Sequence, residues 1–312
     1  MSIDPIMVHD DRYAGWVFDA AHPTQGRRFV HGVEQVRAQA TAAGVNLEVV
    51  VPSPPHRADL ERIHTATYVA EVLDEFQCQE WQGARPDMAE LAELFVGGTL
   101  TALHALLDGS TRTAVHLPGA KHHAQADRAS GFCVFADFSI AATQACDAGH
   151  RVAILDIDAH HGDGTENLLR DHPNVLTYSI HQVGIFPGTG YSSDPEKWVF
   201  NRPLSAGDGD AQLAEGVEHF LEQAVAFDPT LLFIAAGADG LRDDPLTGLH
   251  YTVTGLAQAC ARVRQVFPNH PVLMGGAGGY LPDTGTPQAW GAMAAALASS
   301  CAGTAFKADS LG

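Results

Sequence analysis

The sequence predicts an α/β fold, in which a mainly parallel sheet carries helices on both faces and a site at the carboxyl ends of its strands. Three observations favour this class. Short, nearly continuous apolar segments recur along the chain, longer segments with helical periodicity lie between them, and clusters of polar residues follow directly after the apolar segments. Strands that alternate with helices in this way predict helices on both sides of one sheet.

Six apolar segments are short enough to be strands that are buried on both faces of a parallel sheet. In chain order they are residues 46–52, 112–118, 151–158, 174–180, 230–236 and 270–276. Helices are predicted over residues 26–43, 89–107, 135–148, 210–226, 252–267 and 286–301. Three glycines stand where the C-terminal caps of helices are expected, namely Gly44, Gly109 and Gly149.

The longest irregular stretches each follow a predicted strand, which is where open α/β sheets bind their ligands. They are residues 119–133, 182–208, 237–251 and 276–286. We find no internal repeat, linker or low-complexity tract in the sequence, so a single domain over residues 1–312 is the simplest expectation.

Composition limits the kinds of partner. The chain has 18 Lys and Arg against 37 Asp and Glu, a formal net charge of −19. A nucleic-acid partner is therefore not expected, and a cationic substrate would be attracted.

No stretch looks long and apolar enough to cross a membrane and the start lacks a signal peptide, so no membrane partner and a cytoplasmic location are expected. The five cysteines lack CxxC spacing, which argues against a disulfide framework or a thiolate zinc site. They are Cys78, Cys133, Cys146, Cys260 and Cys301.

The segment ILDIDAHHGDGT places Asp156, Asp158 and His160 two residues apart after an apolar segment. If the strand stays extended, all three side chains point to one side. Asp239 follows another strand, so Asp158, His160 and Asp239 can supply three ligands and leave a position open, as in catalytic zinc sites. An imidazole beside carboxylates suits zinc or iron. Two further acids in the loop after Asp239 are rival ligands, Asp243 and Asp244.

Two adjacent histidines, His122 and His123, indicate proton chemistry near such a metal. The remaining acids of the cluster, Asp156 and Asp163, can each orient one of them. Tyr280 follows a glycine-rich segment at a strand end, where its hydroxyl can donate to an oxyanion. That segment lacks the G-x-G-x-x-G spacing of a dinucleotide site.

Several motifs, in this order, resemble the histone deacetylase superfamily, which includes acetoin-utilisation proteins, acetylpolyamine amidohydrolases and the shorter class IV-like deacetylases. They are HH before SGFCVFADF, DIDAHHGDGT, TYSIHQVGIFPGTG, AAGADGLRDDPLTG and GGAGGYLPD. The resemblance extends over roughly residues 20–300 and is more specific than any one motif. It implies an arginase-like α/β fold and a zinc-dependent deacetylase that removes acetyl or other acyl groups from amines such as acetyl-lysine or acetylpolyamines.

The resemblance also assigns roles to residues. It implies a zinc ion on Asp158, His160 and Asp239, pairs of His122 with Asp156 and of His123 with Asp163, and Tyr280 as the group that polarises the acyl carbonyl. It matches two aromatic residues to the walls of the substrate channel, Phe132 and Phe186. It matches five residues to a structural potassium site, Asp156, Asp158, His160, Ser179 and Ile180.

Two departures from the family pattern bear on channel shape and product exit. Lys121 stands directly before the histidine pair in LPGAKHH, where the family commonly has glycine, and FADF replaces the usual Asn-Asp pair. Two other functions stay open: an arginase-type ureohydrolase with two manganese ions, which would use Asp243 and Asp244, and a non-catalytic scaffold that binds acyl-amines. The sequence leaves open whether the metal is Zn²⁺ or Fe²⁺, and which acylated amine and which oligomeric state apply.

Overall fold

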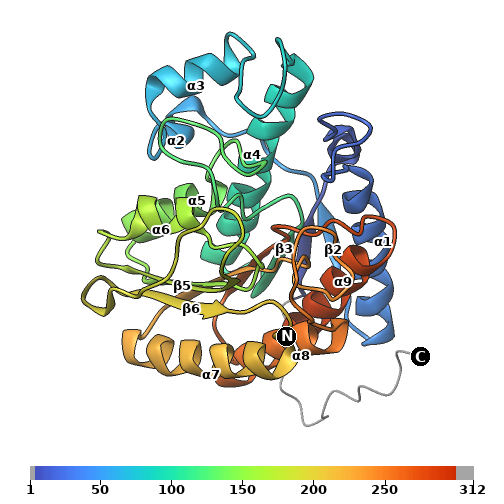
Figure 1. Ribbon diagram of the computed structural model, residues 1–312, viewed down its shortest axis with the longest axis vertical. Helices are drawn as coiled ribbons and strands as arrows, with labels where there is room; N and C mark the ends of the chain where they lie inside the picture. Colours follow the sequence, from blue (N-terminus) through green and yellow to red (C-terminus); the bar gives the residue numbers. More distant parts are fainter. Residues whose placement is uncertain (1–3, 300–312) are drawn as a thin grey trace.

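Eight parallel strands form one sheet in the computed structural model, which describes residues 4–299 (Figure 1). The order across the sheet is β2-β1-β3-β8-β7-β4-β5-β6, and every neighbouring pair is parallel. The fold class predicted from the sequence is therefore confirmed. The strands are β1 (Ile6–Val8), β2 (Glu48–Val50), β3 (Thr113–His116), β4 (Val152–Asp156), β5 (Val175–Gln182), β6 (Val199–Leu204), β7 (Leu231–Ala235) and β8 (Val272–Gly275).

All six predicted strands are present, but two strands were not predicted. β1 has only three residues, too few for a periodic pattern to stand out. β6 lies inside the stretch 182–208, which was expected to be irregular. This expectation is wrong because Asn201, Arg202 and Pro203 interrupt an apolar pattern on an edge strand, whose ladder partner is β5.

The six predicted helices are also present, within a few residues of their expected ends. They are α1 (Arg27–Ala42), α4 (Pro86–Leu107), α5 (Asp137–Asp147), α7 (Asp210–Phe227), α8 (Val253–Val266) and α9 (Gly285–Ala298). The last two residues of the predicted helix 286–301, of which Cys301 is the second, lie outside the described residues. Shorter helices were missed because one or two turns carry little periodicity. They are α2 (Arg57–Leu60), α3 (Ala66–Leu73), α6 (Asp163–Leu169) and the 3₁₀ helices η1 (Asp11–Gly15) and η2 (Pro195–Lys197).

The three expected C-terminal caps are confirmed. Gly44, Gly109 and Gly149 each follow a helix by two residues and have φ values of 69°, 78° and 91°. This left-handed conformation is strained for residues with a Cβ atom, which explains why glycine ends α1, α4 and α5.

Helices cover both faces of the sheet. α4, α5 and α6 lie on one face, and α7 and α8 lie on the other (Figure 1). α9 packs against α1 and α8. The expectation that no stretch is long and apolar enough to cross a membrane is wrong for α4, which has the length and composition to do so. However, 67% of its most apolar 18-residue window is buried inside the protein, as in a core helix.

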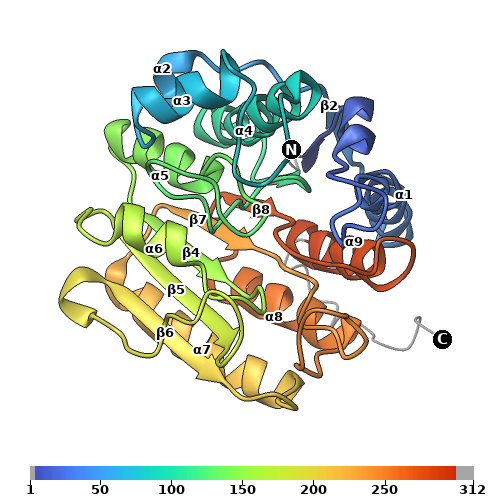
Figure 2. The ribbon, with the colours of Figure 1, turned by 45° about the horizontal axis from the view of Figure 1, so that its top comes forward.

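The carboxyl ends of the central strands lie in register, which brings their following loops together. His116 of β3 pairs with Gly275 of β8, Gly275 with Ala235 of β7, and Ala235 with Asp156 of β4. The indole N–H of Trp290 in α9 is 2.9 Å from the carbonyl oxygen of Gly276 and 3.2 Å from that of Ala236. Four loops that are distant in the sequence therefore meet over the middle of the sheet (Figure 2).

Candidate active site

Asp158, His160 and Asp239 converge just beyond the ends of β4 and β7. One possible ligand atom from each residue lies within 4.8 Å of the others, and all three residues are buried. The strand does not stay extended through His160, since β4 ends at Asp156 and the chain then bends. The bend is held by hydrogen bonds of 2.9 Å from the N–H of His160 to Asp158 and from the N–H of Ala159 to Asp239.

This group of side chains fits a divalent metal ion. Nδ1 of His160 lies 2.8 Å from Oδ2 of Asp239 and 3.2 Å from Oδ1 of Asp158, so nitrogen and oxygen donors face one point. Burial and the charge of Asp158 raise the pKa of Asp239 to about 6, because two carboxylates side by side in a buried site repel each other until a cation compensates them. One imidazole and two carboxylates suit zinc or iron.

Gly278 keeps space free beside these carboxylates. Its N–H donates a 2.6 Å hydrogen bond to Oδ2 of Asp158. A Cβ atom at this position would lie 2.5 Å from Oδ2 of Asp158 and 2.5 Å from Oδ2 of Asp239. A side chain at position 278 would therefore collide with the donor oxygens of Asp158 and Asp239, which explains why this residue is glycine.

The two adjacent histidines each bind a different carboxylate. Nδ1 of His122 lies 2.7 Å from Oδ2 of Asp156, and Nδ1 of His123 lies 2.7 Å from Oδ1 of Asp163. The side-chain amide of Gln125 donates to the other oxygen of Asp163 at 2.9 Å. Because each Nδ1 is engaged, Nε2 is the ring nitrogen that each histidine has left for chemistry. The two ring centroids lie 4.0 Å apart, and Nε2 of His122 lies 3.8 Å from Oδ1 of Asp158.

The two histidines differ in charge. Burial and the neighbouring positive charge of His122 lower the pKa of His123 to about 3, against the opposing effect of Asp163. Burial also acts to lower the pKa of His122, but the charges of Asp156 and Asp158 outweigh it and raise this pKa to about 9. At neutral pH, His123 is therefore the neutral member, which can accept a proton, and His122 carries the positive charge.

A cavity of about 350 Å³ opens in front of His123 and His160. Its walls are Glu80, His123, Gly131, Phe132, His160, Ile185, Phe186, Leu246 and Tyr280. The ring centroid of Phe132 lies 6.2 Å from that of Tyr280, and that of Phe186 lies 4.9 Å from that of His123. The structure thus brings Phe132, Phe186 and Tyr280 into one pocket with the histidines, although Phe186 is 49% exposed.

The rival acids of the loop after Asp239 occupy other places. Asp243 is exposed. Asp244 is buried, and its two oxygens accept hydrogen bonds from the backbone N–H groups of Tyr280 at 2.8 Å and Leu246 at 3.0 Å. Burial and the charge of Asp239 raise the pKa of Asp244 to about 7. Asp244 therefore holds two walls of the cavity, a role that only the fold reveals.

A second residue that sequence reasoning missed is Asp137, the acid within FADF. It is fully buried and accepts hydrogen bonds from the backbone N–H groups of Ala120 at 3.0 Å and Lys121 at 2.7 Å, directly before the histidine pair. Thr99 donates to the same carboxylate, and its hydroxyl also contacts Nδ1 of His116 at 2.9 Å. The FADF motif is the signal in the sequence that marks this position.

Lys121 and Arg28 place two cations beneath the site. Nζ of Lys121 lies 5.1 Å from the ring centroid of Phe95 and 5.8 Å from that of Trp16. Burial and the charge of Arg28 lower the pKa of Lys121 to about 8. Arg28 donates a 2.8 Å hydrogen bond to the carbonyl oxygen of Gly279, next to Tyr280. The departure at Lys121 thus lies in the interior behind the site.

Two of the five residues matched to a potassium site face one small cavity. Asp156 and Ser179 are neighbours on β4 and β5. Both line a cavity of about 10 Å³, where the side-chain oxygens Oγ1 of Thr177 and Oδ1 of Asn201 have no hydrogen-bond partner. A space of this size holds about one water-sized particle.

Comparison with known proteins agrees with this arrangement. A family model described as the histone deacetylase domain matches residues 22–297. The acetoin utilization protein AcuC of Staphylococcus aureus is 35% identical over 223 residues, 68% of this chain and 57% of that protein. AcuC of Bacillus subtilis is 30% identical over 80% of this chain and 70% of its own length, and histone deacetylase 8 of Xenopus laevis is 36% identical over 60% of each chain.

The chain spans little more than half the length of the Staphylococcus aureus relatives that it matches. The family model nevertheless covers the strands and loops that carry all the residues of the candidate site. The chain belongs to the histone deacetylase family.

Proposed function

We propose that this chain is a metal-dependent amidohydrolase that removes acetyl or other acyl groups from amines. One observation carries the proposal: three metal-ligand side chains, two His–Asp pairs and a tyrosine meet at one cavity of about 350 Å³. The family relationship supports the same reaction class.

Zinc is the metal that we propose for Asp158, His160 and Asp239, with Fe²⁺ as the alternative. A bound zinc ion would supply Lewis acidity and lower the pKa of water. The protein's part is to hold the donors, keep the space beside Gly278 free and place the histidine pair next to them. We also propose potassium near Asp156, Asp158, His160, Ser179 and Ile180, where one cavity borders Asp156 and Ser179.

His123 serves as the general base in this proposal. Its Nδ1 is engaged by Asp163, so Nε2 is free to accept a proton from the water molecule that attacks the acyl carbon. His123 then returns this proton to the nitrogen of the leaving amine. His122 stays positively charged beside Asp156, and its charge stabilises the negative charge that develops on the acyl oxygen.

Tyr280 donates a hydrogen bond to that developing oxyanion. Burial, together with the charges of Asp239 and Asp158, raises the pKa of its hydroxyl well above the ordinary value, so the proton stays in place. Phe132 and Phe186 form apolar walls for the acyl-amine chain in the same cavity. Removal of one oxyanion donor typically costs about 3–4 kcal/mol of transition-state stabilisation.

A binuclear ureohydrolase is less well supported. Among residues 4–299, the group of potential ligands that meets at one point is Asp158, His160 and Asp239. Asp243 is exposed, and Asp244 is occupied by two backbone N–H groups. A second manganese ion would need further acids at this point.

The test is metal content and hydrolysis of acetyl-lysine, measured on the same samples. We expect one zinc ion per wild-type chain and measurable turnover, with both lost in Asp239→Ala. Asp243→Ala is the matched control, because it removes an exposed acid from the same loop and should keep metal and activity. Two manganese ions per chain would favour the ureohydrolase, and a full zinc site without turnover on any acylated amine would favour the scaffold.

A further inference from the structure

Phe186 forms one wall of the cavity from the loop between β5 and η2, residues 183–194, which we call the Phe186 loop. The side chain of Phe186 is 49% exposed, so the protein core alone does not hold it. Its ring faces the site: the ring centroid lies 4.9 Å from that of His123 and 6.4 Å from that of His160. The contacts that hold this loop therefore also set the distance between the wall and the site histidines.

Two buried histidines bind the loop three and four residues after Phe186. Nδ1 of His161 lies 2.8 Å from Oγ1 of Thr189, and Nε2 of His181 lies 3.0 Å from the carbonyl oxygen of Gly190. The two imidazole rings pack against each other, with centroids 4.7 Å apart. Both histidines are buried whereas Thr189 is exposed, so the support lies beneath the loop. Neither histidine has a part in the proposed mechanism.

The chemistry of the partners agrees with these contacts. A carbonyl oxygen only accepts, so Nε2 of His181 donates to Gly190, and Nδ1 of His181 accepts from the hydroxyl of Ser179 at 2.9 Å. Burial, together with the neighbouring His161, lowers the pKa of His181 to about 4, which keeps this ring neutral at ordinary pH. Nδ1 of His161 binds the hydroxyl of Thr189 in either protonation state, because a hydroxyl both donates and accepts.

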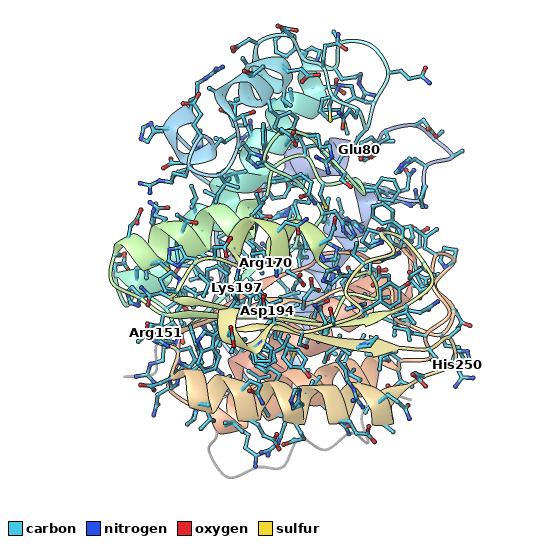
Figure 3. The ribbon with its side chains drawn as sticks, turned by 60° about the vertical axis from the view of Figure 1, so that its left-hand side comes forward. Glu80, Arg151, Arg170, Asp194, Lys197 and His250 are labelled. Carbon is cyan, nitrogen blue, oxygen red and sulfur yellow. The ribbon has the colours of Figure 1, made fainter. Side chains whose placement is uncertain are left out.

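Glu166 in α6 fixes the other side of the His161 ring. Its carboxylate accepts hydrogen bonds from Nε2 of His161 at 3.0 Å and from the side-chain amide of Asn201 in β6 at 2.8 Å. Directly after α6, Arg170 binds Asp194, the last residue of the Phe186 loop, at 3.2 Å (Figure 3). His161 is thus held by α6 and β6, which lie outside the loop that it supports.

Gly190 brings the backbone of the loop directly onto the two rings. A Cβ atom at this position would lie 2.5 Å from Nε2 of His181 and 2.6 Å from Cδ2 of His161, and φ is 78°. Gly188 has almost the same conformation, with φ of 80°, but a Cβ atom there would meet no described atom within 4 Å. A side chain strains the backbone at both positions, but only at Gly190 does it collide with the histidines.

We propose that His161 and His181 are positioning residues for substrate binding, because they fix the Phe186 wall over the cavity through Thr189 and Gly190. They act on how tightly an acylated amine is held and not on the chemical step, since neither is among the residues that line the cavity. This inference rests on the proposed function, because it concerns the same cavity.

The simpler interpretation is that the two histidines only stabilise the fold. His161 directly follows the proposed metal ligand His160, so the test changes the loop and leaves both histidines in place. Gly190→Ala pushes the loop away from the rings. Gly188→Ala is the matched control, because it introduces the same backbone strain without that collision.

On acetyl-lysine, we expect Gly190→Ala to raise KM at least about tenfold and to leave kcat within about threefold, whereas Gly188→Ala should raise KM less than about threefold. Thr189→Val removes only the hydroxyl that binds His161 and should raise KM about 2- to 10-fold, the usual effect of one neutral hydrogen bond. Thr189→Ser keeps the hydroxyl and should behave as the wild type. A fall in kcat as large as the rise in KM would contradict a role in positioning.

A double-mutant cycle separates positioning from fold stability. In the Phe186→Ala background, Gly190→Ala should raise KM by no more than about twofold, because the wall that it displaces is already absent. A KM effect of the same size in both backgrounds would overturn the inference and leave the deacylase proposal intact.

Hydrogen–deuterium exchange gives a readout without turnover. The amide protons of residues 184–190 should exchange faster in Gly190→Ala than in Gly188→Ala, with the rest of the chain unchanged. Equal exchange in the two variants would overturn the inference. Metal-loaded wild type that hydrolyses no acylated amine would instead refute the proposed function, and the exchange experiment would still show whether the histidines hold the loop.

Discussion

Asp244 offers a strict test of how the protein positions Tyr280. Its carboxylate accepts the backbone N–H of Tyr280 at 2.8 Å and that of Leu246 at 3.0 Å, inside a buried site. Asp244→Ala removes the acceptor for both N–H groups. If the hydroxyl of Tyr280 is an oxyanion donor, loss of this support should displace it and slow the chemical step.

The expected size follows from two known scales. Deletion of an oxyanion donor costs about 3–4 kcal/mol, which is the ceiling for an effect that acts through Tyr280. Loss of an acceptor that leaves a buried N–H group without a partner costs about 1–3 kcal/mol. We therefore expect Asp244→Ala to lower kcat about 5- to 150-fold, since each 1.36 kcal/mol of barrier is about tenfold in rate.

The assay is a double-mutant cycle on an acetylated amine. In the Tyr280→Phe background, Asp244→Ala should change kcat by no more than about threefold, because the hydroxyl that it positions is already absent. Metal content and thermal midpoints of all four proteins exclude metal loss and unfolding as causes. Asp243→Ala, an exposed neighbour, is the control. Equal losses from Asp244→Ala in both backgrounds would refute the reasoning.

Three further predictions concern stability and metal affinity. Burial lowers the pKa of His64 to about 4, below the ordinary value of about 6.5, so its contribution to stability is complete above about pH 6.5 and is lost as the pH falls towards 4. Urea unfolding should therefore show the wild type losing about 2 kcal/mol more than His64→Gln between about pH 7 and about pH 5, and equal losses would contradict this. Gly278→Ala should weaken metal affinity at least about tenfold in a competition assay with a chelator, whereas Gly15→Ala, whose Cβ would meet only an ordinary contact of 3.5 Å, should not. Lys121→Met should raise the free energy of unfolding near neutral pH by up to about 3 kcal/mol, because it removes a buried charge whose pKa is lowered to about 8; a less stable variant would show that the aromatic contacts outweigh the burial.

Much of the fold and of the candidate site could be predicted from sequence because the signals were local. The strands of the sheet centre are nearly continuous apolar segments, and the polar residues after them had to meet at one edge if the sheet was parallel. Asp158, His160 and Asp239 follow from that rule alone, since they come after β4 and β7, which are neighbours in the sheet.

Other features depend on contacts that no local pattern encodes. Asp244 and Asp137 support the site through backbone N–H groups of residues far away in the chain, so only the fold shows what their carboxylates bind. Glu80 reaches the cavity from the segment between two helices, not from a strand end, and the rule about strand ends could not find it. β6 lies at the sheet edge, where polar residues and Pro203 are tolerated and hide the strand.

The strand order also has a consequence for the order in which the chain can fold during synthesis. β8 lies between β3 and β7, so residues 272–275 are needed to join the sheet of β1, β2 and β3 to that of β4, β5, β6 and β7. Until these residues leave the ribosome, the two groups of strands have no direct pairing. Asp158, His160 and Asp239 all belong to the second group, whereas His122 and His123 follow β3 in the first. The nascent chain can thus bring the three proposed metal ligands together before the proposed general base His123 joins them, and this joining requires the pairing of β8, a contact between distant parts of the chain.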